Sequence, residues 1–182
     1  MNVPHFHQPE DNYCIPTCQK MVLDYMIQNQ KVKCKPFSIS TIAKVTKTRV
    51  IDGTAPKAAE YVNTLLHRAK PPIKFKLFEG QKFGEIIKEL DEERPVIAII
   101  NLAELPRRVW HAVVIVNFDP ETNMVTYDDP DENEDNPLIS VEVGGFMKKW
   151  GWQARMIKVL LGTKGQTYID GDWKDDGTEV AL

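Results

Sequence analysis

The chain has 182 residues, of which 42% are hydrophobic and 27% are charged, and its formal net charge is −3. These values are typical of one soluble globular domain with a hydrophobic core. They indicate neither a nucleic acid partner nor a membrane partner. The sequence has no apolar run of membrane-spanning length and does not open with a signal-peptide pattern, so we expect a cytoplasmic protein, with a secreted trimmed or effector domain as the alternative.

The predicted elements follow from hydrophobic periodicity and from the positions of Pro and Gly. Pro16 suits the first turn of a helix, where its missing N–H is not needed. The predicted helices are 16–28, a short segment around 42–45, 56–66, 81–93 and a turn at 146–150. The predicted strands are 3–7, 73–77, 96–100, 111–117, 124–128 and 156–161. Helices come first and strands cluster in the second half, which predicts an α+β fold rather than alternating α/β.

Charged residues are distributed unevenly in the second half of the chain. Residues 119–135 contain eight Asp or Glu and neither Lys nor Arg, which is typical of a solvated loop. The alternative is a role in attracting basic substrates. Arg107 and Arg108 are also interpreted as part of a solvated loop, with selection of acidic substrate groups as the alternative. We expect a single domain over 1–162, followed by a polar, acidic and loosely held C-terminal tail over 163–182.

The three cysteines, Cys14, Cys18 and Cys34, are an odd number, which argues against a disulfide framework and for a reducing compartment. Cys14 lies at the start of the first predicted helix, where backbone N–H groups and the helix dipole stabilise a thiolate. Cys18 lies one turn later and is expected to be buried as a small hydrophobe. Taken alone, both could equally be core cysteines.

His111 leads directly into the apolar run 112–116, and Tyr127-Asp-Asp-Pro130 ends the next predicted strand. A histidine beside such a run is more often a core residue than a base. Across a hairpin, however, Asp128 or Asp129 could accept a hydrogen bond from the imidazole and orient it, as the acid of a catalytic triad does. Strand alternation puts the two carboxylates on opposite faces, so only one can do so.

Gln8 precedes Cys14 by six residues. Its side-chain amide and the backbone N–H of Cys14 would together make a two-donor oxyanion hole, although a glutamine in a loop is by itself more often a surface residue. Thiol, imidazole, carboxylate and amide are the parts of a cysteine-nucleophile hydrolase.

The order and spacing of these segments resemble the bacteriocin-processing, double-glycine type of papain-like cysteine peptidases and their stand-alone relatives. The resemblance rests on the segment from Gln8 to Cys14, on Trp110-His111 with its following strand, and on Asp129-Pro130. It also includes Val3-Pro4, Gly53-Thr54, Arg94-Pro-Val-Ile97 and Phe146-Met-Lys-Lys-Trp150, and so spans residues 3–162 in the same order.

The resemblance implies a papain-like fold, in which N-terminal helices pack on a C-terminal antiparallel sheet, and a peptide or protein substrate. It further implies that Cys14 is the nucleophile and that His111 is the base and acid. Asp129 is the implied orienting group, because the family's acid directly precedes a proline, and Gln8 is the implied oxyanion donor. The resemblance implies no cofactor or metal. It distinguishes neither hydrolysis from acyl transfer nor one oligomeric state from another.

One residue departs from the family pattern. Relatives usually have Gly after the nucleophile, whereas this chain has Ile15, which adopts positive φ with difficulty and crowds the thiol. This departure motivates a second hypothesis, a catalytically inactive papain-fold module that binds a peptide or protein partner. A third hypothesis is a zinc site with the ligands Cys14, Cys18, Cys34 and either His5 or His7. It is disfavoured because the chain has no second closely spaced ligand pair.

Overall fold

The computed structural model describes all residues except 30, 103–108, 134, 152, 164–165, 170–171 and 176–182. Among the described residues, a six-stranded antiparallel sheet has the strand order β1-β6-β2-β3-β4-β5. Its strands are β1 (Ile73–Phe78), β2 (Val96–Asn101), β3 (Trp110–Asp119), β4 (Met124–Asp128), β5 (Leu138–Glu142) and β6 (Arg155–Leu161). The helices are α1 (Cys14–Gln28), α2 (Ile39–Val45), the 3₁₀ helix η1 (Pro56–Thr64), α3 (Phe83–Asp91) and α4 (Val143–Trp150).

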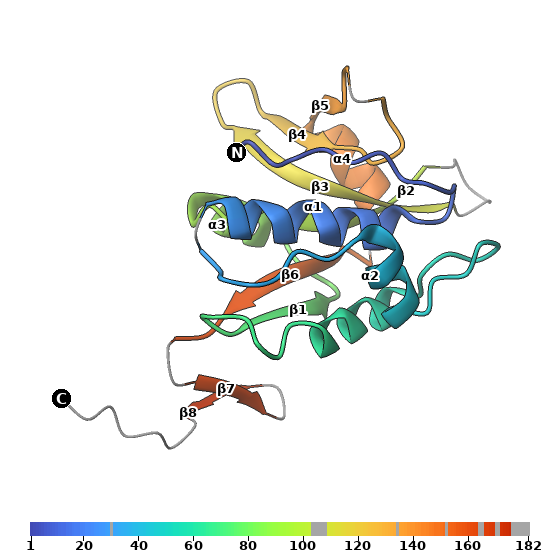
Figure 1. The fold of residues 1–182 in the computed structure, drawn as a ribbon. Helices are drawn as coiled ribbons and strands as arrows, with labels where there is room; N and C mark the ends of the chain where they lie inside the picture. Colours follow the sequence, from blue (N-terminus) through green and yellow to red (C-terminus); the bar gives the residue numbers. More distant parts are fainter. Residues whose placement is uncertain are drawn as a thin grey trace.

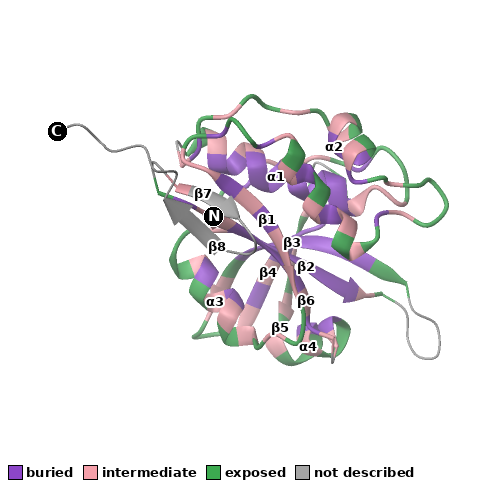
Figure 2. Cartoon of the chain, turned by 90° about the horizontal axis from the view of Figure 1, so that it is seen from below, coloured by how far each residue is buried: buried purple, intermediate pink, exposed green. Residues whose placement is uncertain are grey.

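Helices cover both faces of the sheet (Figure 1; Figure 2). α1, α2 and η1 pack on one face, and α3 and α4 pack on the other. β2 and β3 are therefore covered on both sides, and residues 96–100 and 111–116 are all buried. A strand buried on both faces needs apolar side chains in both directions, which is why these segments are continuous apolar runs rather than alternating ones.

α1 is the central helix of its face, with ten of its fifteen residues buried. The Cys18 thiol in its first turns is fully buried and donates a hydrogen bond to the Ala112 carbonyl oxygen at 3.2 Å. This contact holds the beginning of α1 against the beginning of β3. It therefore sets the position of Cys14, which lies one helical turn earlier on the same side of the helix.

The predicted α+β class with N-terminal helices on an antiparallel sheet is confirmed. The predicted entry strand at 3–7 is wrong, because this segment joins no β-ladder. Its far end is tied to the loop after β4 by the Gln8 N–H, which donates to the Pro130 carbonyl oxygen at 2.7 Å. β5 was not predicted from the sequence. It is an edge strand without a fully buried side chain, and its apolar alternation is limited to Ile139 and Val141, which is too short to indicate a strand by itself.

The segment predicted as a C-terminal tail contains two short strands. β7 (Gln166–Ile169) and β8 (Asp172–Asp175) pair as a separate antiparallel sheet, while the domain boundary at residue 162 stays a prediction. The end of the predicted tail, 176–182, and the pair Arg107 and Arg108 lie outside the described residues. In the described part of the chain, no helix is long and apolar enough to cross a membrane.

Candidate active site

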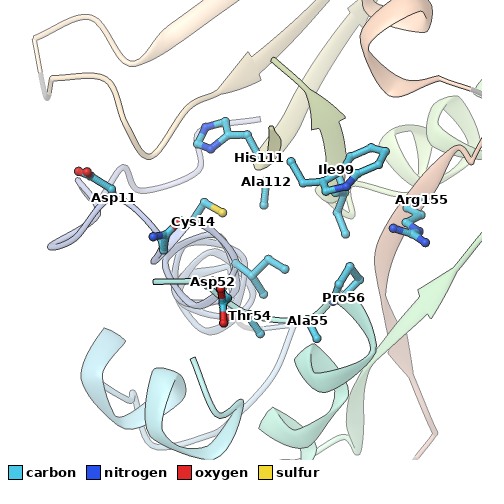
Figure 3. Close-up of a pocket in the computed structure, with 14 residues that line it drawn as sticks. Asp11, Cys14, Asp52, Thr54, Ala55, Pro56, Ile99, His111, Ala112 and Arg155 are labelled. Carbon is cyan, nitrogen blue, oxygen red and sulfur yellow. The ribbon is translucent and has the colours of Figure 1, made fainter. Parts of the chain in front are cut away.

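A cleft of about 300 Å³ opens where the N-terminus of α1 faces the beginning of β3 (Figure 3). Cys14 and His111 lie near each other toward one end of this cleft, and Arg155 of β6 lies toward the other end. Between them, Ile99 and Ala112 come from β2 and β3. The segment 52–56 forms the opposite wall.

The wall formed by residues 52–56 is attached to the loop that carries the nucleophile candidate. The Asn12 side-chain amide donates to the Val50 and Ile51 carbonyl oxygens at 2.5 and 3.2 Å. Gly53 has φ +70°, and a Cβ added there would lie 3.1 Å from the Asn12 carbonyl oxygen. The Gly of the Gly53-Thr54 motif is therefore required by both its backbone conformation and this close approach.

Cys14 is the first residue of α1 and is partly exposed to the cleft. The first N–H groups of a helix have no partner within the helix, so the Cys14 N–H is available to a bound carbonyl oxygen, and the helix dipole favours negative charge there. The pKa of the Cys18 thiol, in contrast, is raised well above its ordinary value. Burial is the main cause, and the nearby Cys14, Asp129 and Asp128 add to it. The structure thus separates an accessible thiol from a buried one, as predicted.

His111 and Asp129 form a buried pair beside Cys14. The imidazole Nε2 lies 2.6 Å from Asp129 Oδ1, which leaves Nδ1 for the thiol. Burial lowers the pKa of His111, but hydrogen bonds to Asp129 and Cys14, together with their charges, outweigh burial and raise the pKa to about 10. Burial likewise raises the pKa of Asp129, but the hydrogen bond and charge of His111 reverse this and hold it below its ordinary value.

A second His–Asp pair lies next to the first and was not anticipated from the sequence. His5 Nδ1 lies 2.6 Å from Asp128 Oδ1, and Asp128 is 1% exposed. Burial raises the pKa of Asp128, and the His5 hydrogen bond only partly offsets this. The two adjacent carboxylates therefore point in different directions, as expected from strand alternation. Asp128 is bonded to His5, and Asp129 is bonded to His111. Nothing in the local sequence indicated His5, because its position depends on where the N-terminal segment lies.

Gln8 is buried close to this site, with 4% of its surface exposed. Its Nε2 donates to the Asp11 carbonyl oxygen at 3.2 Å and to Asp131 Oδ1 at 3.0 Å. Both N–H groups of the amide are used in this way, so donation to an oxyanion requires the release of one of these bonds. Taken alone, Gln8 was expected to be a surface residue, and this expectation is wrong because its side chain is buried. Its catalytic role stays a proposal.

Ile15 does not distort the helix. It lies within α1, does not have a positive φ, and is 4% exposed while lining the cleft. The positive φ that a β-branched residue adopts with difficulty is therefore not required of Ile15. Its side chain instead occupies space in the cleft beside the thiol. All three cysteines are free. In the described part of the chain, no three His, Cys, Asp or Glu side chains are placed to hold a metal ion, so the zinc site considered above does not form there.

The model of the Peptidase_C39-like family matches residues 1–155 of the chain. The protein belongs to this C39-like peptidase family. The resemblance inferred from the sequence motifs is thereby confirmed, and family and fold together support a cysteine peptidase-like hydrolase. No curated protein matches the chain at a significant level.

Two solved structures of C39 peptidases share the fold. A C39-like peptidase from Bacillus anthracis superimposes with a TM-score of 0.66 at 18% identity, covering 90% of this chain and 96% of that chain. The peptidase domain of Streptococcus ComA, a bifunctional ABC transporter involved in a quorum-sensing pathway, superimposes with a TM-score of 0.59 at 16% identity. That match covers 87% of this chain and 97% of the domain. The predicted papain-like fold class is confirmed by these matches.

The raised pKa of His111 predicts that its imidazole stays protonated well above neutral pH. An ordinary histidine with a pKa of about 6.5 is mostly neutral at pH 8, whereas His111 should remain an imidazolium there because Asp129 and Cys14 stabilise the charged form. An NMR titration of the four histidines, with His111 assigned through His111→Gln, measures this directly. Asp129→Asn should lower the midpoint, and a wild-type midpoint near 6.5 would contradict the prediction.

Proposed function

We propose that the protein is a cysteine-nucleophile hydrolase that cleaves peptide, isopeptide or amide bonds through an acyl-enzyme on Cys14. The observation that carries this proposal is the buried His111, which is bonded to Asp129 and lies beside Cys14 at the N-terminus of α1. The family and fold support a peptide or protein substrate.

In the proposed reaction, the Cys14 thiolate attacks the carbonyl carbon while His111 holds the thiol proton. The carbonyl oxygen becomes an oxyanion, which accepts hydrogen bonds from the Cys14 N–H and from the Gln8 amide. His111 then gives its proton to the leaving amine as the C–N bond breaks, and a thioester remains on Cys14. Asp129 keeps the imidazole oriented throughout and stabilises its positive charge.

The acyl group leaves in a second step that follows the same pattern. His111 takes a proton from water, the resulting hydroxide attacks the thioester, and the Cys14 thiolate is expelled as a carboxylic acid forms. A primary amine can replace water in this step, which would make the protein an acyltransferase. Both reactions use the same residues, so the acceptor that reaches the cleft decides between them.

The second candidate function is an inactive papain-fold module that binds a peptide or protein partner. The observation that favours it is Ile15, whose side chain lines the cleft beside Cys14. This candidate differs from the hydrolase in the chemistry of the thiol, since a binding module needs no paired thiolate and imidazolium.

Alkylation of Cys14 distinguishes the two candidates. In the hydrolase, the imidazolium of His111 stabilises a thiolate on Cys14, so we expect iodoacetamide to label Cys14 much faster than Cys34 at neutral pH. The rate should fall strongly in His111→Ala. Cys34 is a built-in control because it is also partly exposed and burial raises its pKa; peptide mapping separates the two. Labelling of Cys14 that is as slow as that of Cys34 and is unchanged by His111→Ala would favour the binding module.

The two adjacent carboxylates provide a matched pair of variants. Asp129→Asn removes the charge bonded to His111 and should reduce kcat by roughly 10²- to 10⁴-fold in an assay of peptide cleavage. Asp128→Asn makes the same chemical change one residue away, on the carboxylate bonded to His5, and should reduce kcat by less than about 10-fold. Equal losses in the two variants would contradict the assignment of Asp129.

The role of Gln8 is tested against Gln19, a second buried glutamine that donates to the Ala59 carbonyl oxygen at 2.8 Å. Loss of an oxyanion donor costs about 10²- to 10³-fold in kcat, so Gln8→Ala should show a loss of this order. Gln19→Ala should lower the free energy of unfolding while kcat stays within about 3-fold of wild type, because its amide only supports packing. A Gln8→Ala variant with normal kcat would remove Gln8 from the oxyanion hole.

A further inference from the structure

Arg155 belongs to a row of side chains that crosses the floor of the cleft. Ile99 of β2 lies opposite Ala112 of β3 and opposite Arg155 of β6. Residues directly opposite each other on neighbouring strands share a face of the sheet. With strands about 4.8 Å apart, Arg155 is two strand spacings, or roughly 10 Å, from Ala112. This distance corresponds to about three residues of an extended peptide.

The Arg155 guanidinium is held in a fixed orientation at its end of the cleft. Its Nε donates to Glu79 Oε1 at 2.7 Å, and its central carbon lies 5.5 Å from the centroid of the Trp110 ring. Among the described residues, no hydrogen-bond acceptor is assigned to either Nη atom. The arginine side chain is 22% exposed, so these N–H groups are partly desolvated while still reachable from the cleft.

Such an arginine is suited to bind a carboxylate. The planar fork of N–H donors matches the two oxygens of a carboxylate, and stacking on an aromatic ring reduces the entropy lost when the contact forms. Asp11 lies at the other end of the cleft, beyond Cys14 (Figure 3). The cleft therefore has a fixed positive charge at one end, the apolar Ile99 and Ala112 on its floor, and a negative charge at the end nearest the thiol. The carboxylate of Asp52, on the opposite wall, is paired with Arg49 at 2.6 Å.

We propose that Arg155 binds an acidic side chain of the substrate and so makes the enzyme prefer peptides with Asp or Glu two or three residues from the scissile bond. This inference rests on the proposed hydrolase function and names the substrate class of the same cleft. Ile99 and Ala112 contact the apolar residue that lies between the scissile bond and the acidic group. Glu79 orients Arg155 through Nε, and its own charge also competes with that of the substrate.

The test uses a synthetic peptide library, with the cleavage sites mapped by mass spectrometry for the wild type and for Arg155→Ala, Arg155→Lys and Arg155→Glu. The wild type should favour Asp or Glu at one position two or three residues from the cleaved bond. Arg155→Ala should lower kcat/KM for such a peptide by roughly 10- to 100-fold relative to the matched Gln peptide. Arg155→Lys should recover only part of the preference, because a lysine lacks the fork. Arg155→Glu should reverse the preference toward Lys or Arg.

Glu79→Gln is a second, independent variant that leaves Arg155 in place. Removal of the competing charge should increase the preference for the acidic peptide over the Gln peptide by about 2- to 5-fold, the range expected for one exposed ion pair. Iodoacetamide labelling of Cys14 and the thermal unfolding midpoint serve as controls for folding in every variant, since neither depends on substrate charge.

Different outcomes would contradict the role of Arg155 and the proposed hydrolase function. Cleavage that requires Cys14 but shows the same charge preference in wild type, Arg155→Ala and Arg155→Glu would overturn the role of Arg155 and leave the hydrolase proposal intact. Absence of any cleavage that requires Cys14, across the whole library, would overturn the hydrolase proposal and the inference with it.

Discussion

The packing of α1 against β3 is the constraint on which the rest of this molecule depends. Cys18 is fully buried and bonded to the Ala112 carbonyl oxygen, and this contact, together with the other buried side chains of α1, fixes the helix against the strand. Because Cys14 is one turn before Cys18, and His111 directly precedes Ala112, the same contact brings the accessible thiol to the imidazole. A shift of the helix by one residue would rotate Cys14 by about 100° and separate the two groups.

The buried charges of the site are tolerated because each has a partner. Asp128 and Asp129 are adjacent and nearly inaccessible, and two neighbouring carboxylates in such a place repel each other. His5 and His111 approach them from different segments at 2.6 Å each, and a buried ion that loses its partner is strongly destabilising. The N-terminal segment is thereby coupled to the site, since the same segment also supplies Gln8. The acidic stretch 119–135 is accordingly not only a solvated loop, because two of its carboxylates are part of the buried centre.

In the proposed function, the cleft has the reacting groups at one end and Arg155, the proposed group for substrate recognition, at the other. His111 lies at the beginning of β3 and Asp129 directly follows β4. β2 carries Ile99 in register with Ala112 of β3 and with Arg155 of β6. Side chains placed by the hydrogen-bond ladder of a sheet keep their separations. The spacing between the His111 end of β3 and Arg155 is therefore set by the strand order, whereas the thiol is placed by the packing of α1 on β3. In the proposed function, this arrangement places the reacting carbonyl group of the substrate at one end of the cleft and an acidic substrate side chain at Arg155.

Local patterns in the sequence were sufficient for the elements that have a strong buried face and for most of the site. The runs 96–100 and 112–116 are apolar because both faces of β2 and β3 are covered, so they could be recognised without the fold. Cys14 and His111 could be named because their residue types and order carry a specific chemistry, whereas Asp129 was preferred to Asp128 only through the resemblance to the family. The choice between Asp128 and Asp129, the His5 pair, the bonds of Gln8 and the position of Arg155 could not be predicted in this way. Each depends on which segments far apart in the chain are brought into contact, and only the packing of α1 and the N-terminal segment on the sheet decides that.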